Sequence, residues 1–444
     1  MRMKRRHCHC PILSLVFLFL ICASPGLGSD RPCCSDDPEV SYLLFPQSTQ
    51  AYRYQVRYEI FFSTMLGKEK GFFVVLPEGF DRDSGNRYPV LFLLHGYNFH
   101  RNGVWWKVTD PKKAEKVLCE AREEEYHWLL HEDVAIIAAA LMDPRNLTYG
   151  DLEKSLEKRF EELSKHGGLA KGDYTSKEIA QSIVSHNLHP GNLKDPYSPI
   201  RKMILVLPDG DNGFYTDENE GKSLFPETKD RGGCDGFLEG EAYPYSLFPF
   251  LYMKPGALGK YESYFLELVR SVESHFSMKA KLLPKRGIGG VSMGGLGAMK
   301  IGLKYPDLFQ SMSSQSGLLD LEVVKNKWML KMLMPEYLEI FGRLEAKQFP
   351  PSSSFDLNHI RANSPVAILK EKRIDRLQAS IYFDYGKNED YSGITLGNRN
   401  FEKATGEGSH QIDAQPFNGK AGHNYQFWRS RLGVVLQHHS DQLH

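Results

Sequence analysis

The middle of the chain contains a glycine-rich stretch, residues 286–303, that reads RGIGGVSMGGLGAMKIGL. Arg286–Val291 has the short apolar pattern of a strand, and Gly294–Leu303 is predicted to be a helix rich in small residues. Ser292 lies between them at the centre of a G-x-S-x-G sequence. A strand that turns sharply into a helix strains the backbone at its central residue, so the neighbouring residues must lack bulky side chains. The stretch therefore predicts a strand–turn–helix unit that lifts the Ser292 hydroxyl above the end of a sheet.

The segments on either side of this unit alternate between strands and helices. Tyr88–Leu94 and Met203–Leu207 are nearly continuous apolar runs, which are typical of strands buried on both faces. Further strands are predicted at Arg53–Thr64, Gly71–Leu76, Gln310–Ser316 and Ala379–Asp384, and a helix at Glu262–Phe276. This alternation predicts an α/β fold with a mostly parallel central sheet and helices on both faces.

Two long segments fit the alternation poorly and are predicted to be insertions, at about residues 112–199 and 212–261. The first is highly charged and helical in pattern, and the second is rich in Gly, Pro, Tyr and Phe. Long loops in compact domains usually cover or shape a site, although decoration without a catalytic role is an equal alternative.

A nucleophilic serine needs a base, and in folds of this kind the chain order is serine, acid, histidine. His423 lies on a glycine-preceded loop just before a segment of helical pattern that contains Phe427 and Trp428, and it is the predicted base. The other downstream histidines are interpreted as surface residues (His359, His410) or as solvated helix-end residues (His438, His439, His444).

The acid should follow a late strand, and Ala379–Asp384 is such a strand. Asp390 is the preferred candidate and Glu389 the alternative; Asp384 is less favoured because it lies inside the strand. The tetrahedral intermediate also needs backbone N–H donors at its oxyanion. These are predicted to be the amides of Met293 and Tyr97, the latter in the loop after an early strand. His95 in that loop is interpreted as a structural residue that bonds loop backbone.

With these residues assembled, the chain resembles the putative esterase family of the α/β-hydrolases. That family includes S-formylglutathione hydrolase, feruloyl and acetyl-xylan esterases and the mycobacterial mycolyltransferases. The matching segments are Tyr88–Tyr97, Val206–Gly210, Gly290–Gly295, Tyr305–Phe309 with Ser316-Gly317, and Gly422-His423 with Phe427-Trp428. The resemblance extends over roughly residues 52–432 and implies a carboxylic ester hydrolase with a Ser-acid-His triad.

The chain departs from the family at the acid loop and in its insertions. The family usually reads Gly-x-x-Asp there, whereas Gly386 is followed by Lys387-Asn388-Glu389-Asp390, which leaves the acid ambiguous by one residue. The large insertions mean that substrate preference cannot be carried over.

The N-terminus has the pattern of a secretory signal peptide, predicted at residues 1–28. A basic head precedes an apolar run of about 13 residues, which is short against the roughly 20 needed to span a bilayer. An uncleaved anchor is the alternative. After cleavage no membrane span is expected, and a secreted or periplasmic location is predicted. The signal peptide would be followed by an N-terminal extension (29–50), the hydrolase domain (51–436) and a C-terminal tail (437–444).

The composition excludes several functions. The chain has 444 residues with 55 basic and 55 acidic side chains, and this balance argues against a nucleic-acid partner. Four of the basic residues lie in the predicted signal peptide, so the mature chain would be mildly acidic. Four cysteines remain after cleavage, and their pairing as disulfides is open: Cys33, Cys34, Cys119 and Cys234. The chain contains no CxxC pair, so a structural zinc site is not expected. The Pro208–Gly213 loop resembles a calcium loop only superficially.

The sequence therefore predicts an exported serine esterase that acts on a small-molecule or carbohydrate-linked ester and needs no cofactor or metal. Two alternatives stay open: an acyltransferase with the same triad, and a non-catalytic binding protein on the same fold. The natural ester and the oligomeric state are not determined by the sequence.

Overall fold

The computed structural model describes the following residues: 55–77, 80, 87–97, 134–142, 200–211, 213–218, 259–277, 281–323, 340–341, 356–372, 379–386, 389, 392–406, 412–417, 422–423 and 425–443. The predicted signal peptide, the N-terminal extension, the four cysteines of the mature chain and Asp390 lie outside these residues. No helix among the described residues is long and apolar enough to cross a membrane.

The described residues form an eight-stranded sheet with the order β1-β2-β4-β3-β5-β6-β7-β8. The six strands from β4 to β8 in this order run parallel, and β1 and β2 are antiparallel to their neighbours. The strands are β1 (Gln55–Ser63), β2 (Lys68–Leu76), β3 (Arg87–Leu94), β4 (Ile204–Pro208), β5 (Lys281–Gly290), β6 (Ser311–Gln315), β7 (Ser380–Gly386) and β8 (Ile412–Phe417).

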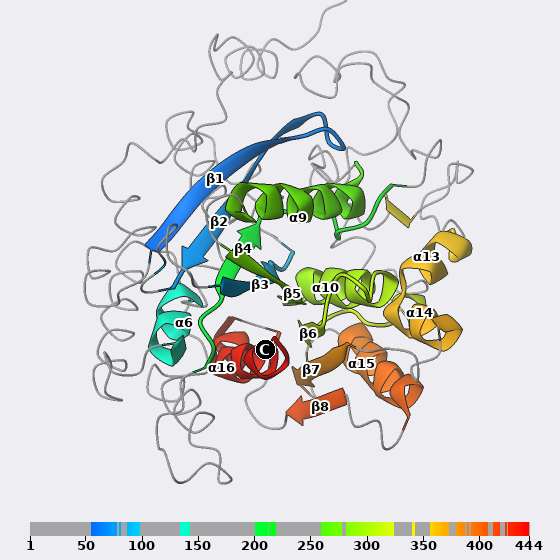
Figure 1. Cartoon of the computed structure of the whole chain (residues 1–444). Coiled ribbons are helices and arrows are strands. Elements are labelled where there is room, and N and C mark those ends of the chain that lie inside the picture. Colours follow the sequence, from blue (N-terminus) through cyan, green and yellow to red (C-terminus); the bar gives the residue numbers. More distant parts are fainter. Residues whose placement is uncertain are drawn as a thin grey trace, which may run out of the picture.

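Helices cover both faces of this sheet (Figure 1). On one face α9, α10 and α15 pack against the strands, while on the other α16 contacts β6, β7 and α6. The helices are α6 (Val134–Met142), α9 (Tyr261–Ser277), α10 (Met293–Lys304), α13 (Leu357–Asn363), α14 (Pro365–Lys372), α15 (Ser392–Thr405) and α16 (Tyr425–Gln442), with a 3-10 turn η7 (Leu321–Val323). The predicted fold class, an α/β-hydrolase fold with a mostly parallel sheet, is confirmed.

The apolar runs identified in the sequence form the central strands. Every residue of β4 is buried, and all of β3 is buried except Arg87, as expected for strands covered on both faces. The structure adds elements that the sequence patterns did not predict, namely strand β8, which pairs with β7 at one edge of the sheet, and helices α13, α14 and α15. Helix α6 lies within the first range expected to be an insertion, whose pattern was helical.

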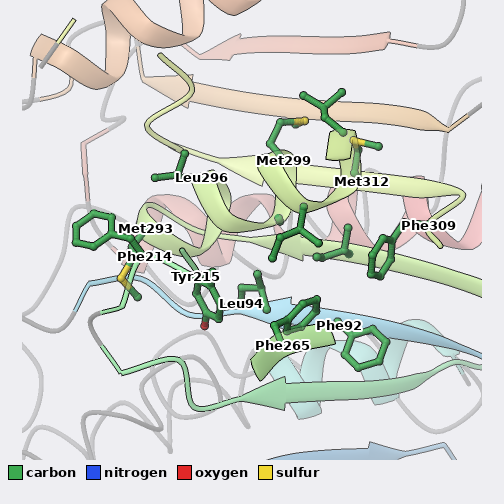
Figure 2. Packing of buried hydrophobic residues seen from close by; sticks show 14 of the residues in the cluster. Phe92, Leu94, Phe214, Tyr215, Phe265, Met293, Leu296, Met299, Phe309 and Met312 are labelled. Carbon is green, nitrogen blue, oxygen red and sulfur yellow. The ribbon is translucent and has the colours of Figure 1, made fainter. Parts of the chain in front are cut away.

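A cluster of aromatic and sulfur-containing side chains packs α9 and α10 onto the sheet (Figure 2). Phe265 of α9 meets the ring of Phe92 of β3 edge-on at 5.5 Å and stacks on Phe309 at 6.4 Å between centroids. Burying each such side chain stabilises the fold by about 1.5–3 kcal/mol. Met299 of α10 belongs to the same cluster, so this packing fixes the helix that begins directly after Ser292.

Candidate active site

Ser292 lies on a strained turn between β5 and α10. Its φ and ψ are 52° and −115°, in a region that residues with side chains rarely adopt. A Cβ on Gly290 would lie 2.5 Å from the Gly294 carbonyl, and one on Gly294 would lie 2.0 Å from the Leu94 carbonyl. The two glycines of the motif are therefore a steric requirement of the turn. Ser292 is 7% exposed, so its hydroxyl is nearly enclosed.

His423 lies two residues before α16 and faces this turn. Its Nε2 is 2.8 Å from the Ser292 hydroxyl, although the two residues are far apart in the sequence. Its Nδ1 is 3.1 Å from Oε2 of Glu389, whose side chain is completely buried. A carboxylate can only accept a hydrogen bond, so Nδ1 carries the proton and Nε2 is free to accept from Ser292. The serine, the histidine and the glutamate are thus hydrogen-bonded in series.

The three acid candidates have different positions. Glu389 contacts His423, and Asp390 lies outside the described residues. Asp384 is bound by Tyr382 at 2.7 Å and by Arg431 at 3.3 Å, on β7 and α16. Burial raises the pKa of Asp384 to about 6, so its environment disfavours the charge that an orienting acid must carry.

Two residues around Glu389 were not predicted as part of the site. Oε1 of Glu389 accepts from the Ser316 hydroxyl at 2.6 Å and from the Gly386 backbone N–H at 2.7 Å. The indole N–H of Trp428 donates to the Ser316 hydroxyl at 3.0 Å. The sequence contained a signal for both, because Ser316-Gly317 and Phe427-Trp428 belong to the segments that resemble the esterase family.

The loop after β3 contains Tyr97, a predicted oxyanion donor. His95 bonds backbone on both sides: its Nδ1 is 2.8 Å from the Gly96 carbonyl, and its Nε2 accepts the Gly210 N–H at 2.8 Å. Nδ1 therefore carries the proton of a neutral ring, and burial lowers the pKa of His95. These contacts agree with the interpretation of His95 as a structural residue. A Cβ on Gly96 would lie 3.4 Å from Cβ of Ser292, so this loop borders Ser292.

The Pro208–Gly213 loop, which resembled a calcium site, is held by ion pairs. Asp209 and Asp211 both pair with the buried Lys70, and Asp211 also lies 3.0 Å from Lys68. In the described part of the chain, no group of three or more His, Cys, Asp or Glu side chains is placed to hold a metal ion.

A buried lysine, Lys300, links helix α10 to the loop that contains Thr216. Lys300 of α10 donates to Thr216 Oγ1 at 2.7 Å and lies 3.0 Å from Glu262 of α9. Burial lowers the pKa of Lys300 to about 8. Two neighbouring lysines, Lys300 and Lys304, outweigh burial and lower the pKa of Glu262 to about 2. Both groups are therefore charged at neutral pH, and their pairing anchors α10.

One tail residue differs from its expected environment. His439 was interpreted as a solvated helix-end residue, but it is completely buried in α16. Its Nδ1 and Nε2 bond the hydroxyls of Ser311 and Ser313 at 2.7 and 2.8 Å. A Cβ on Gly289 of β5 would lie 3.2 Å from its Nε2, so glycines in β5 make room for the ring. The polar composition of the tail concealed this buried pairing.

A serine on a strained strand-to-helix turn, within a mostly parallel α/β sheet, is typical of serine hydrolases with the α/β-hydrolase fold. Residues 257–439 match the model of the family described as "Putative esterase", and this range includes Ser292, Glu389 and His423. The match confirms the resemblance to that family that the motifs predicted, and it supports a serine esterase.

Three solved structures to which the chain is similar have low sequence identity. A ferulic acid esterase is 18% identical, over 88% of this chain and 99% of that chain, with a TM-score of 0.46. An S-formylglutathione hydrolase from Agrobacterium tumefaciens is 16% identical, over 88% and 97%, with a TM-score of 0.43. MPT51 of Mycobacterium tuberculosis is 11% identical, over 87% and 99%, with a TM-score of 0.44. A search of curated protein sequences returned no match.

Proposed function

We propose that this chain is an exported serine carboxylic ester hydrolase that uses Ser292, His423 and Glu389 as its triad and forms an acyl-enzyme. One observation carries the proposal. The Ser292 hydroxyl, on the strained turn, is 2.8 Å from His423 Nε2, and His423 Nδ1 is 3.1 Å from a buried carboxylate. This series of contacts is the arrangement that activates a serine at neutral pH.

In the first step Ser292 Oγ attacks the carbonyl carbon of the ester while its proton passes to His423 Nε2. The imidazolium that forms is stabilised by Glu389, which also holds the ring in the required tautomer. His423 then gives the proton to the leaving alcohol, and the C–O bond to that alcohol breaks. The product of this half-reaction is an acyl group bound to Ser292.

The amides of Met293 and Tyr97 are proposed to hold the oxyanion. Met293 is the first residue of α10, and the first N–H groups of a helix have no partner within the helix. For Tyr97, support comes from His95, which binds the carbonyl of Gly96. Because the N–H and C=O of one peptide point in opposite directions, this bond turns the Tyr97 N–H away from His95.

In the second half-reaction water replaces the alcohol. His423 takes a proton from water, the hydroxide attacks the acyl carbon, and the proton returns to Ser292 as the acid leaves. The residues of this chain move every proton in these steps. The expected substrate is a small-molecule or carbohydrate-linked ester.

The test is covalent labelling with a fluorophosphonate, combined with turnover of p-nitrophenyl acetate. Wild-type protein is expected to be labelled and active, and Ser292→Ala to lose both properties. Ser313→Ala is the matched control, because Ser313 also bonds a histidine at 2.8 Å but is completely buried. Full turnover by a folded Ser292→Ala protein would refute the mechanism.

Export rests on the sequence of residues 1–28 alone and is tested separately. The full chain, expressed in a secreting host, is expected to appear outside the cytoplasm with a new N-terminus at about residue 29, as a signal peptide requires. A chain that keeps Met1 and remains in the cytoplasm would contradict export without affecting the proposed chemistry.

A further inference from the structure

Ser316 and Trp428 form a hydrogen-bonded pair behind the carboxylate of Glu389. Ser316 directly follows β6, and Trp428 lies in the first turn of α16. Resting on the proposed function, we infer that this pair sets the position of the triad acid, with Ser316 as a positioning residue and Trp428 orienting its hydroxyl.

The donors and acceptors leave only one direction for the hydrogen bonds. An indole nitrogen can only donate, so the 3.0 Å bond from Trp428 makes the Ser316 oxygen an acceptor. The single hydroxyl proton of Ser316 is then available to Glu389 Oε1, 2.6 Å away. A donor that itself accepts a hydrogen bond is polarised, and this strengthens its own bond. Trp428 therefore fixes Ser316 as a donor toward the carboxylate.

The bonds to Oε1 leave Oε2 for the histidine. Ser316 and the Gly386 N–H both bind Oε1, while His423 binds Oε2. The plane of the carboxylate is set by contacts to both oxygens, so the direction of Oε2 is fixed before a substrate arrives. Hydrogen bonds to the charged form also offset the cost of burying a carboxylate that has no solvent contact.

Trp428 contacts the triad a second time through its ring. The planes of Trp428 and His423 are nearly perpendicular at 89°, with centroids 5.0 Å apart. This edge-to-face geometry is favourable and restricts rotation of the imidazole. One side chain thus restrains the base directly and the acid through Ser316.

The backbone at Ser316 supports a functional role for the residue. Its φ is 50°, a left-handed value that is uncommon for serine. Its N–H is held by the Asp384 carbonyl at 2.8 Å, which keeps the end of β6 against β7 in this conformation. Strained residues of this kind occur preferentially at functional sites, and Ser292 at the end of the adjacent strand is a second example.

The experiment compares Ser316→Ala with Ser314→Ala. Ser314 lies on β6 two residues earlier and is also buried, and its hydroxyl has no hydrogen-bond partner among the described residues. Loss of a hydrogen bond to a charged group predicts a fall in kcat of about 10- to 100-fold for Ser316→Ala. KM is expected to stay within about twofold, because Ser316 is placed to act on the acid and not on the substrate. Ser314→Ala should leave both constants unchanged.

Trp428→Phe provides a second route, since it removes the indole N–H and keeps an aromatic ring. Its effect should be smaller than that of Ser316→Ala, and the double variant should be no slower than Ser316→Ala alone, because both changes act through one bond. In histidine-labelled protein, the proton resonance of His423 Nδ1 should shift in both variants and remain in place in Ser314→Ala.

Each result decides the inference. Equal kcat values for Ser316→Ala and Ser314→Ala, or additive effects of Ser316→Ala and Trp428→Phe, would overturn it. If Ser316→Ala does not fold, the kcat and resonance of Trp428→Phe decide instead, and wild-type values there would overturn it. Failure of the proposed function is recognised separately, as wild-type protein that neither takes the label nor turns over ester, and this would remove both proposals.

Discussion

Within the described residues, a serine hydroxyl bonds a histidine at the same distance in two separate places. Ser292 bonds His423 at 2.8 Å at the carboxyl end of β5, and Ser313 bonds His439 at 2.8 Å between β6 and α16. In the first pair the second ring nitrogen faces Glu389. In the second pair it faces the hydroxyl of Ser311, and among the described residues no carboxylate bonds that ring.

The difference bears on the proposed mechanism, in which Ser292 and not Ser313 is the nucleophile. The second ring nitrogen of His423 faces the Glu389 carboxylate, whereas burial lowers the pKa of His439 well below its ordinary value. Ser292 is also slightly exposed on a strained turn, while Ser311 and Ser313 are completely buried within a regular strand. The first pair is suited to proton transfer, and the second stabilises packing between the sheet and α16.

The largest expected effect is on the acid. Glu389→Gln should lower kcat by about 1,000- to 10,000-fold, because an amide can donate to Nδ1 and hold His423 in the wrong tautomer. Stability should change little, since the amide has the same shape. The measurement is ester turnover, with thermal unfolding as a check on folding.

Asp390→Asn is the matched control for this variant, because Asp390 was the preferred acid in the sequence. It is expected to retain most of the wild-type kcat. A larger loss in Asp390→Asn than in Glu389→Gln would assign the acid to Asp390 and contradict the assignment of Glu389.

The ambiguity between these two neighbours shows how far the sequence can specify the site. The G-x-S-x-G turn restricts a position through steric limits that glycines reveal directly, so Ser292 could be selected from local residues. The acid is selected by contacts from other elements: Ser316 after β6 and the Gly386 N–H at the end of β7. No local pattern encodes which of two adjacent carboxyl groups will meet those donors.

The fold likewise has elements that the local sequence predicts and elements that depend on distant contacts. Continuous apolar runs predicted β3 and β4, because central strands are covered on both faces. Strand β8 reads IDAQPF, a short segment whose apolar residues are interrupted by Asp413 and Gln415 and which contains a proline, a residue that is tolerated at the edge of a sheet. The burial of His439 was missed because its partners, Ser311 and Ser313, lie on a strand distant in sequence and look like ordinary polar residues.

The next prediction distinguishes the two serine–histidine pairs by their effect on the free energy of unfolding. His439→Leu should lower the free energy of unfolding by about 3 kcal/mol, because two buried hydroxyls lose their partner. Its kcat per folded molecule should remain near wild type. His423→Leu should do the reverse and abolish turnover with a small change in stability. Denaturant unfolding together with active-site titration by fluorophosphonate measures both quantities.

Because His439 of the second pair is buried, the free energy of unfolding should depend on pH. The folded pKa of His439 is below 6.5, so below pH 6.5 the unfolded chain binds more protons and stability falls as the pH falls. Asp384, with a folded pKa of about 6 that lies above its unfolded value, acts in the opposite direction between about pH 4 and 6.

The difference between wild type and His439→Leu removes the contribution of Asp384, which both proteins share. The stability advantage of wild type should therefore shrink by about 1.4 kcal/mol per pH unit below pH 6.5. Unfolding free energies measured at pH 7, 6 and 5 test this, and an advantage that is constant over this range would show that His439 is not held neutral.

The smallest expected effect is that of removing one hydroxyl from the second pair. A neutral imidazole has one donor and one acceptor, so Ser311 and Ser313 must act in opposite senses toward His439. In Ser313→Ala the bond between Ser311 and Nδ1 of His439 can persist in either tautomer of the ring, because a hydroxyl can donate or accept, while the buried Nε2 loses its partner. The expected loss is about 1 kcal/mol in unfolding free energy, with label and turnover unchanged. A loss of turnover larger than the loss of folded protein would mean that this pair is coupled to Ser292, whose strand packs beside β6, and the two sites would then have to be treated as one network.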